Sequence, residues 1–180
     1  DDTEIMLDCY MAWDKEFTVR AAERLKAYDV KWLEDPLHPD GMHEYADIRQ
    51  SVKPIQLAVG NLMFSYKGFH HILQAGAGDI IQPEVQWAGG MTEVHRIAEM
   101  SKAHGLPVIP HGATVYNFHF VISHTNAPYA EYLTVGDGTE VRPVFEAIED
   151  EPLPENGAVT LSDEPGFGVG LNRDIISPYA

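Results

Sequence analysis

Short apolar segments alternate with amphipathic helical segments along the first 135 residues of this 180-residue chain. Most of the apolar segments do not alternate with polar residues, which is typical of strands covered on both faces. The intervening segments repeat apolar residues at helical spacing. The pattern predicts an α/β protein with a parallel sheet, open or closed into a barrel. The expected strands are 4–10, 30–36, 54–61, 78–85, 106–112 and 129–135, and the expected helices are 15–28, 42–52, 66–76, 89–105 and 115–124.

Each expected strand ends at a polar residue that can take part in chemistry. In a (β/α)8 barrel the C-terminal ends of all strands open into one mouth, where catalytic groups gather. We therefore expect these side chains to converge on a single site, although strands of any α/β protein also lead into polar loops. In chain order the residues are Asp8, Glu34, Asn61, Glu84, His111 and Glu131, at intervals of 20 to 27 positions.

The first five of these residues form two chemical groups. Asp8, Glu34 and Asn61 offer only oxygen donors, which suit Mg²⁺ better than zinc. Glu84 and His111 follow at the next two strand ends, where a carboxylate can fix the tautomer of an imidazole and make it a general base. A lone histidine at a strand end is more often a hydrogen-bonded structural residue, so this hypothesis depends on the other strand ends.

A divalent metal and a histidine base together suit the removal of a proton next to a carboxylate. The metal binds the substrate carboxylate and stabilises the enediolate that forms when the α-proton leaves. Glu131 could donate a hydrogen bond to this anionic substrate if its surroundings raise its pKa.

The net charge and the composition of the chain argue against some classes of binding partner. With 28 acidic and 12 basic residues the formal charge is −16, which should repel nucleic acid and anionic membranes. This acidity fits either an ordinary cytoplasmic enzyme or adaptation to high salt, where ions screen self-repulsion. Cys9 is the single cysteine, which suits a reducing cytoplasm. The acidic N-terminus does not resemble a signal peptide.

From about residue 136 the pattern changes to Pro- and Gly-rich loops, so we expect barrel units in 1–135 and a C-terminal tail in 136–180 that packs on them.

Several motifs resemble one family. "WLEDPL", "IIQPEVQWAGGMTE", "PHG" and "NAPYAEYL" are similar to the C-terminal barrel of the enolase superfamily, mandelate racemase subgroup, and in particular to L-rhamnonate dehydratases and related acid-sugar dehydratases. The resemblance implies a (β/α)8 barrel of which the chain holds about strands 3 to 8, without the N-terminal capping domain. It also implies a homo-oligomer.

The resemblance assigns a role to each strand-end residue. Asp8, Glu34 and Asn61 take the Mg²⁺-ligand positions, and Asp35 would support its neighbouring ligand. Two further positions, Glu84 and His111, match the catalytic dyad, and Glu131 would face the substrate carboxylate.

Two positions depart from the rhamnonate dehydratase pattern. Asn61 replaces a glutamate ligand, as in glucarate dehydratases, and the lost charge should weaken metal affinity. Glu84 replaces the usual aspartate, and the extra methylene changes its reach toward His111 by about an ångström.

These observations predict Mg²⁺-dependent dehydration of an aldonate to a 2-keto-3-deoxy acid. The same groups acting on a substrate without a departing hydroxyl would give a racemase or epimerase. A non-catalytic barrel homologue that binds a metal or a sugar acid is the third hypothesis.

Overall fold

A four-stranded parallel sheet forms the centre of the protein. The structure is a computed structural model and describes residues 3–112, 114–134 and 146–176. The strands β1 (Ile5–Asp8), β2 (Val30–Glu34), β3 (Gln56–Val59) and β4 (Ile80–Ile81) pair in sequence order. Two isolated parallel bridges, Ile81 with Val108 and Glu84 with His111, extend the sheet beyond β4. The parallel sheet predicted from the sequence is therefore confirmed.

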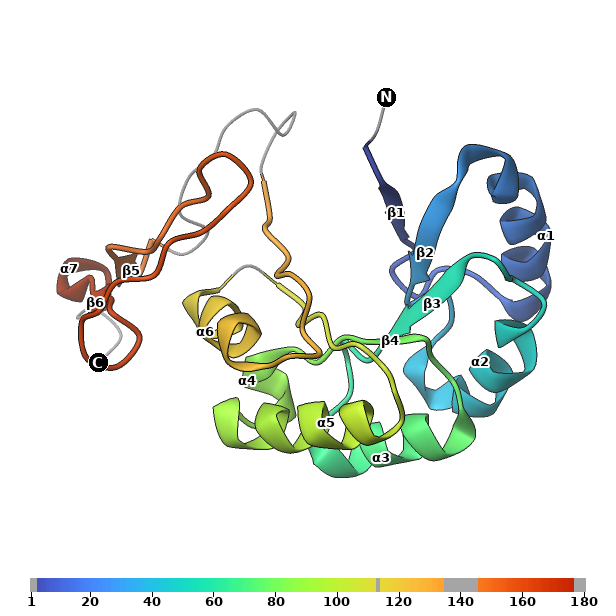
Figure 1. Cartoon of the computed structure of the whole chain (residues 1–180). Coiled ribbons are helices and arrows are strands. Elements are labelled where there is room, and N and C mark those ends of the chain that lie inside the picture. Colours follow the sequence, from blue (N-terminus) through green and yellow to red (C-terminus); the bar gives the residue numbers. More distant parts are fainter. Residues whose placement is uncertain (1–2, 113, 135–145, 177–180) are drawn as a thin grey trace.

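Helices connect the strands and lie in an arc around the outer side of the sheet (Figure 1). This strand–helix order, with all helices of the repeat outside, is that of a portion of a (β/α)8 barrel. The helices of the repeat are α1 (Lys15–Leu25), which continues as the 3₁₀ turn η1 (Lys26–Tyr28), α2 (Met42–Arg49), which follows the 3₁₀ turn η2 (Pro39–Gly41), α3 (Ser65–Ala75), α5 (Met91–Ala103) and α6 (Val115–Ser123).

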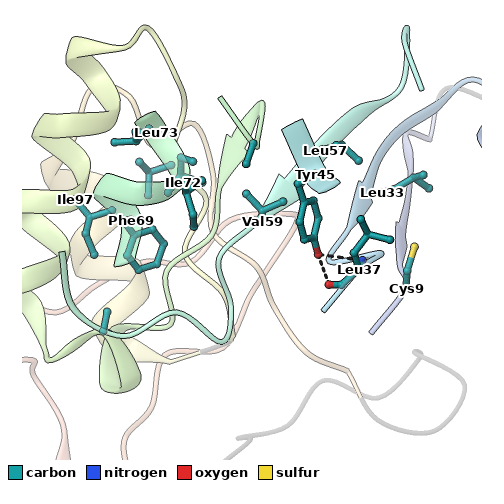
Figure 2. Close-up of a cluster of buried hydrophobic side chains, with 14 of the residues drawn as sticks. Cys9, Leu33, Leu37, Tyr45, Leu57, Val59, Phe69, Ile72, Leu73 and Ile97 are labelled. Atoms are coloured by element: carbon teal, nitrogen blue, oxygen red, sulfur yellow. Dashed lines mark hydrogen bonds between the residues drawn. The ribbon is translucent and has the colours of Figure 1, made fainter. Parts of the chain in front are cut away.

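The main hydrophobic core lies between the sheet and these helices. Leu33 and Leu57 are fully buried there, together with Tyr45 of α2. Figure 2 shows the Tyr45 hydroxyl directed at Leu37, from whose N–H it accepts a hydrogen bond of 3.0 Å and to whose carbonyl it donates. These contacts attach α2 to the chain just after β2, which fixes the position of the strand end.

A second, smaller cluster covers the opposite face of the sheet. It consists of one residue each from β2, β3, β4 and the bridged segment beside β4, and Met6 of β1 packs against it. Because side chains alternate between faces along a strand, the residues two positions later lie on the same inner face, nearer to the C-terminal strand ends. The cluster is Trp32, Ala58, Ile80 and Ile109, and the next residues on this face are Asp8, Glu34, Gly60, Gln82 and His111.

An ion cluster around the buried Asp79 lies at the N-terminal ends of β3 and β4. The Asp79 carboxylate accepts hydrogen bonds from Arg49 at 2.8 Å, from Lys53 at 2.7 Å and from the N–H of Leu57 at 2.9 Å. Asp79 precedes β4 and Leu57 lies in β3, so the carboxylate joins the two strands at the end opposite to the polar residues.

Some sequence predictions were wrong. Residues 129–134 form no strand, residue 135 lies outside the described residues, and the ring of Tyr129 instead stacks on Trp32 with centroids 6.2 Å apart. Segment 106–112 forms only two isolated bridges and no full strand. In segment 78–85 the strand β4 ends at Ile81. The last residue of that segment, Val85, begins the helix α4 (Val85–Ala88), which the side chain of Glu84 caps.

The tail contains more regular structure than the loop composition predicts. It forms the antiparallel pair β5 (Ile148–Glu149) and β6 (Gly170–Leu171), followed by α7 (Arg173–Ile176). Phe167 contacts α6 through the rings of Tyr116 and His119, with centroids 4.8 and 5.4 Å away. Among the described residues, no helix is both long and apolar enough to cross a membrane.

Candidate active site

Two carboxylates start from neighbouring positions on adjacent strands. Asp8, the last residue of β1, is the register partner of Glu34, the last residue of β2. The chain after Asp8 continues along β2, because Cys9 donates its N–H to the Glu34 carbonyl at 2.9 Å and Met11 to the Asp35 carbonyl at 2.6 Å. The loop therefore holds the Asp8 carboxylate beside the end of β2.

The turn that carries Asn61 is held by Asp35. The Asp35 carboxylate accepts a hydrogen bond of 3.3 Å from the N–H of Gly60 and another from the N–H of Asn61. Asp35 is buried and has a φ of +35°, an uncommon conformation for a residue with a side chain. This strained residue holds the backbone of Asn61 next to β2, whereas the sequence led us to expect that it would support its neighbour Glu34.

Negative charge is concentrated at this end of the sheet. Burial, together with the charges of Glu131, Asp8 and Asp35, raises the pKa of Glu34 to about 7, although a hydrogen bond from Gln82 opposes the shift. Burial likewise raises the pKa of Asp35 to about 6. Clustered, partly desolvated carboxylates of this kind are stabilised in their ionised form by a nearby cation.

The available donors fit Mg²⁺. Within residues 3–112, 114–134 and 146–176, no lysine or arginine forms an ion pair with the carboxylates at this strand end. The same residues contain no group of three His, Cys, Asp or Glu side chains that could hold a metal ion. The candidate ligands Asp8, Glu34 and Asn61 are two carboxylates and one amide, and the amide is not one of these four residue types. All three would bind an ion through oxygen, the ligand atom that Mg²⁺ prefers.

Glu84 and His111 are brought together by a parallel bridge between their backbones. The Oε1 atom of Glu84 accepts from the N–H of Gln86 at 2.9 Å and so caps α4. Its other oxygen, Oε2, lies 3.5 Å from Nδ1 of His111. This separation is at the outer limit of a hydrogen bond, and such contacts often shorten when substrate binds.

The surroundings of His111 favour its protonated form. Burial lowers the pKa of the imidazole, but the hydrogen bond that the ring donates to Glu84 and the charges of Glu131 and Glu34 outweigh it, so the pKa of His111 is raised above its usual value. A histidine that is half-buried beside carboxylates can take up a proton from a substrate without leaving an uncompensated charge.

Glu131 reaches the site without belonging to a strand. Its Oε2 atom accepts a hydrogen bond of 2.7 Å from the N–H of Gly112, the residue after His111. The prediction that Glu131 ends a strand was wrong, but its charge acts on both Glu34 and His111. The structure thus brings Glu131 to the same end of the sheet as the dyad positions.

Two buried amides near the site were missed in the sequence. Gln82 is 1% exposed and hydrogen-bonds Glu34, and its Oε1 atom has no partner among the described residues. Its place two residues after Ile80 on the inner face could have revealed it. Asn117 of α6 is fully buried and donates to the carbonyls of the turn that follows His111. Nothing in the local sequence pattern distinguishes Asn117 from a helix-surface asparagine.

The chain matches a known protein family. Residues 1–175 match the family described as "Enolase C-terminal domain-like". The chain belongs to this family. It is 42% identical over 177 residues to the L-rhamnonate dehydratase of Saccharopolyspora erythraea, a match that covers 97% of the chain and 45% of the relative. The chain thus spans about half the length of this curated relative.

Solved structures show the same fold. The rhamnonate dehydratase of Gibberella zeae complexed with Mg superposes with a TM-score of 0.90 at 34% identity, covering 98% of the chain and 44% of that structure. A racemase of Streptomyces coelicolor A3(2) with bound magnesium gives a TM-score of 0.87 at 24% identity, over 99% of the chain and 47% of that structure, and at this identity shows the fold alone. The predicted relationship to the enolase superfamily and the barrel fold are confirmed.

Proposed function

We propose that this enolase-superfamily barrel dehydrates an acid sugar, an aldonate with hydroxyls at C2 and C3, to a 2-keto-3-deoxy acid. Asp8, Glu34 and Asn61 would hold Mg²⁺. When bound, the ion supplies positive charge to the substrate carboxylate as the C2 proton leaves. The similarity to L-rhamnonate dehydratases at 42% and 34% identity supports this substrate class.

His111 would carry out both proton transfers of the reaction. His111, oriented by Glu84, would take the C2 proton, and Glu131, which lies beside the turn after His111, would face the substrate carboxylate. The C–O bond at C3 then breaks, and the departing hydroxide takes a proton from His111 and leaves as water. The resulting enol tautomerises to the 2-keto acid, and His111 is neutral again at the end of the cycle.

One observation carries the proposal: a carboxylate–imidazole pair lies at strand ends next to a cluster of oxygen donors. The bridge between Glu84 and His111 fixes the pair, and the β1–β2 register fixes two of the donors. The charges of Glu34 and Glu131 act on His111, which indicates that the base and the oxygen donors share one electrostatic environment.

The direct test is incubation of the intact protein with Mg²⁺ and a panel of aldonates, followed by detection of 2-keto acid. We expect keto product from at least one aldonate, loss of product with EDTA, and recovery when Mg²⁺ is added back. Substitution His111→Asn should lower kcat by about 10²- to 10⁴-fold, the usual contribution of a general base. His71→Asn, on the exposed surface of α3, is the matched control and should be neutral.

Deuterium incorporation at C2 separates the remaining possibilities. Exchange of the C2 hydrogen from D₂O without keto product would contradict dehydration and would indicate a racemase or an epimerase. Binding of aldonates with neither exchange nor product would show a non-catalytic homologue and overturn the proposal.

The organisation of the chain also remains a proposal. We expect residues 1–135 to carry the chemistry and 136–180 to pack against them, for which the contacts of Phe167 with α6 are the support. A homo-oligomer, a cytoplasmic location, and the absence of nucleic-acid and membrane partners are the accompanying predictions.

A further inference from the structure

Asn117 ties the first turns of α6 to the backbone of His111. Its Nδ2 atom donates to the carbonyl of His111 at 2.6 Å and to that of Gly112 at 2.5 Å. An amide nitrogen carries two hydrogens, so a single side chain can satisfy both carbonyls. Asn117 is fully buried, so water cannot replace these hydrogen bonds.

Other contacts hold the same two residues from the opposite side. The N–H of His111 donates to the carbonyl of Pro83 at 3.0 Å, and the N–H of Gly112 donates to Glu131 at 2.7 Å. His111 and Gly112 are therefore each held at both the backbone N–H and the carbonyl. Gly112 has a φ of +84°, so the turn depends on a backbone conformation that is specified by these bonds.

We propose that Asn117 is a positioning residue that sets the orientation of His111 toward Glu84 and of the Gly112 N–H toward Glu131. This inference rests on the proposed function for its catalytic consequence. The distance from Nδ1 of His111 to Glu84 is already 3.5 Å, so a small rotation of the turn breaks that contact. Glu131 would lose its backbone donor in the same movement.

The chain offers a matched control at the other end of the sheet. Nδ2 of Asn126 also donates to two backbone carbonyls, those of Ala98 at 3.1 Å and Leu106 at 3.4 Å. Leu106 precedes the bridge residue Val108, so Asn126 lies by the N-terminal end of this strand position, away from His111. Removing either amide deletes the same kind of bond, but only Asn117 supports the base.

The experiment compares Asn117→Ala with Asn126→Ala in the intact protein. We expect both to lower the Tm, and only Asn117→Ala to lower kcat, by about tenfold to a hundredfold, with KM and Mg²⁺ affinity within about twofold of the parent. Mg²⁺ affinity measured by calorimetry should persist because the metal positions lie on β1, β2 and the turn after β3. Asn117→Ser, a milder change, takes the place of Asn117→Ala if that variant does not fold.

A second readout does not depend on activity. NMR titration of the histidine rings in metal-free protein should show a lower pKa for His111 in Asn117→Ala than in Asn126→Ala, because the ring moves away from Glu84. Equal His111 pKa values and equal kcat in the two variants would overturn the positioning role. A parent protein that neither dehydrates nor exchanges any aldonate would refute the proposed function instead, while the titration would still decide the role of Asn117.

Discussion

Gly112 is the position where a single methyl group should separate the base from its carboxylate partner. A Cβ atom at Gly112 would lie 3.0 Å from Oε2 of Glu84, the oxygen that faces His111. The residue also has a φ of +84°, which costs a residue with a side chain about 1–2 kcal/mol. Gly112→Ala therefore combines backbone strain with a steric contact at the site.

Gly105→Ala is the control, because it introduces the backbone strain of a positive φ without a steric contact. Gly105 has a φ of +70°, and a Cβ atom there meets nothing within 4 Å. Gly105→Ala should lower the free energy of unfolding by about 1–2 kcal/mol, and Gly112→Ala should lower it by more, as measured by urea denaturation. Subtracting the effect of Gly105→Ala from that of Gly112→Ala isolates the contact with Glu84.

Only Gly112→Ala should change the chemistry. With Glu84 displaced, burial dominates the environment of His111 and its pKa falls. We expect kcat for keto-acid formation to fall by about tenfold or more, and the rising limb of the pH–rate profile to move to lower pH. If the two alanine variants have the same kcat and the same profile, the reasoning that Glu84 orients and charges His111 is refuted.

Three further perturbations test the site and its support. Because the base acts in its neutral form and the pKa of His111 is raised, kcat/KM should rise with pH through a value above 6.5, and Glu84→Gln should move that limb downward; an unmoved limb would exclude Glu84 as the partner. Asn61→Asp should tighten Mg²⁺ binding by about tenfold in calorimetry, because it adds a negative ligand, and unchanged affinity would argue against Asn61 as a ligand. Burial raises the pKa of Asp79, but the hydrogen bonds from Lys53, the Leu57 N–H and Arg49 outweigh it and hold this pKa below its usual value. The stability that Asp79 contributes is thus present above its unfolded pKa of about 3.9 and is lost as the pH falls through the folded value. Asp79→Asn should lower the free energy of unfolding by about 3 kcal/mol at neutral pH, and by much less in acid, in denaturation curves at both pH values.

The composition of the site was predictable only where the chain repeats. Asp8 and Glu34 could be found because each ends an apolar strand in phase with the strand–helix repeat, and the β1–β2 register pairs them. Glu84 and His111 could be found on the same grounds, although Glu84 caps α4 as well as facing the histidine. Glu131 was selected for a wrong reason, since residues 129–134 form no strand.

The sequence by itself determined the order of strands and helices and the end of the sheet at which the polar residues collect. Apolar periodicity and strand-end chemistry are local properties, and the parallel repeat converts them into a shared location. Only the tertiary structure decided that Glu131 meets Gly112, that Gln82 supports Glu34 and that Asn117 holds the His111 turn. These contacts join residues whose own segments carry no pattern that requires them, because a buried donor binds whichever carbonyl or carboxylate the packed helices bring to it.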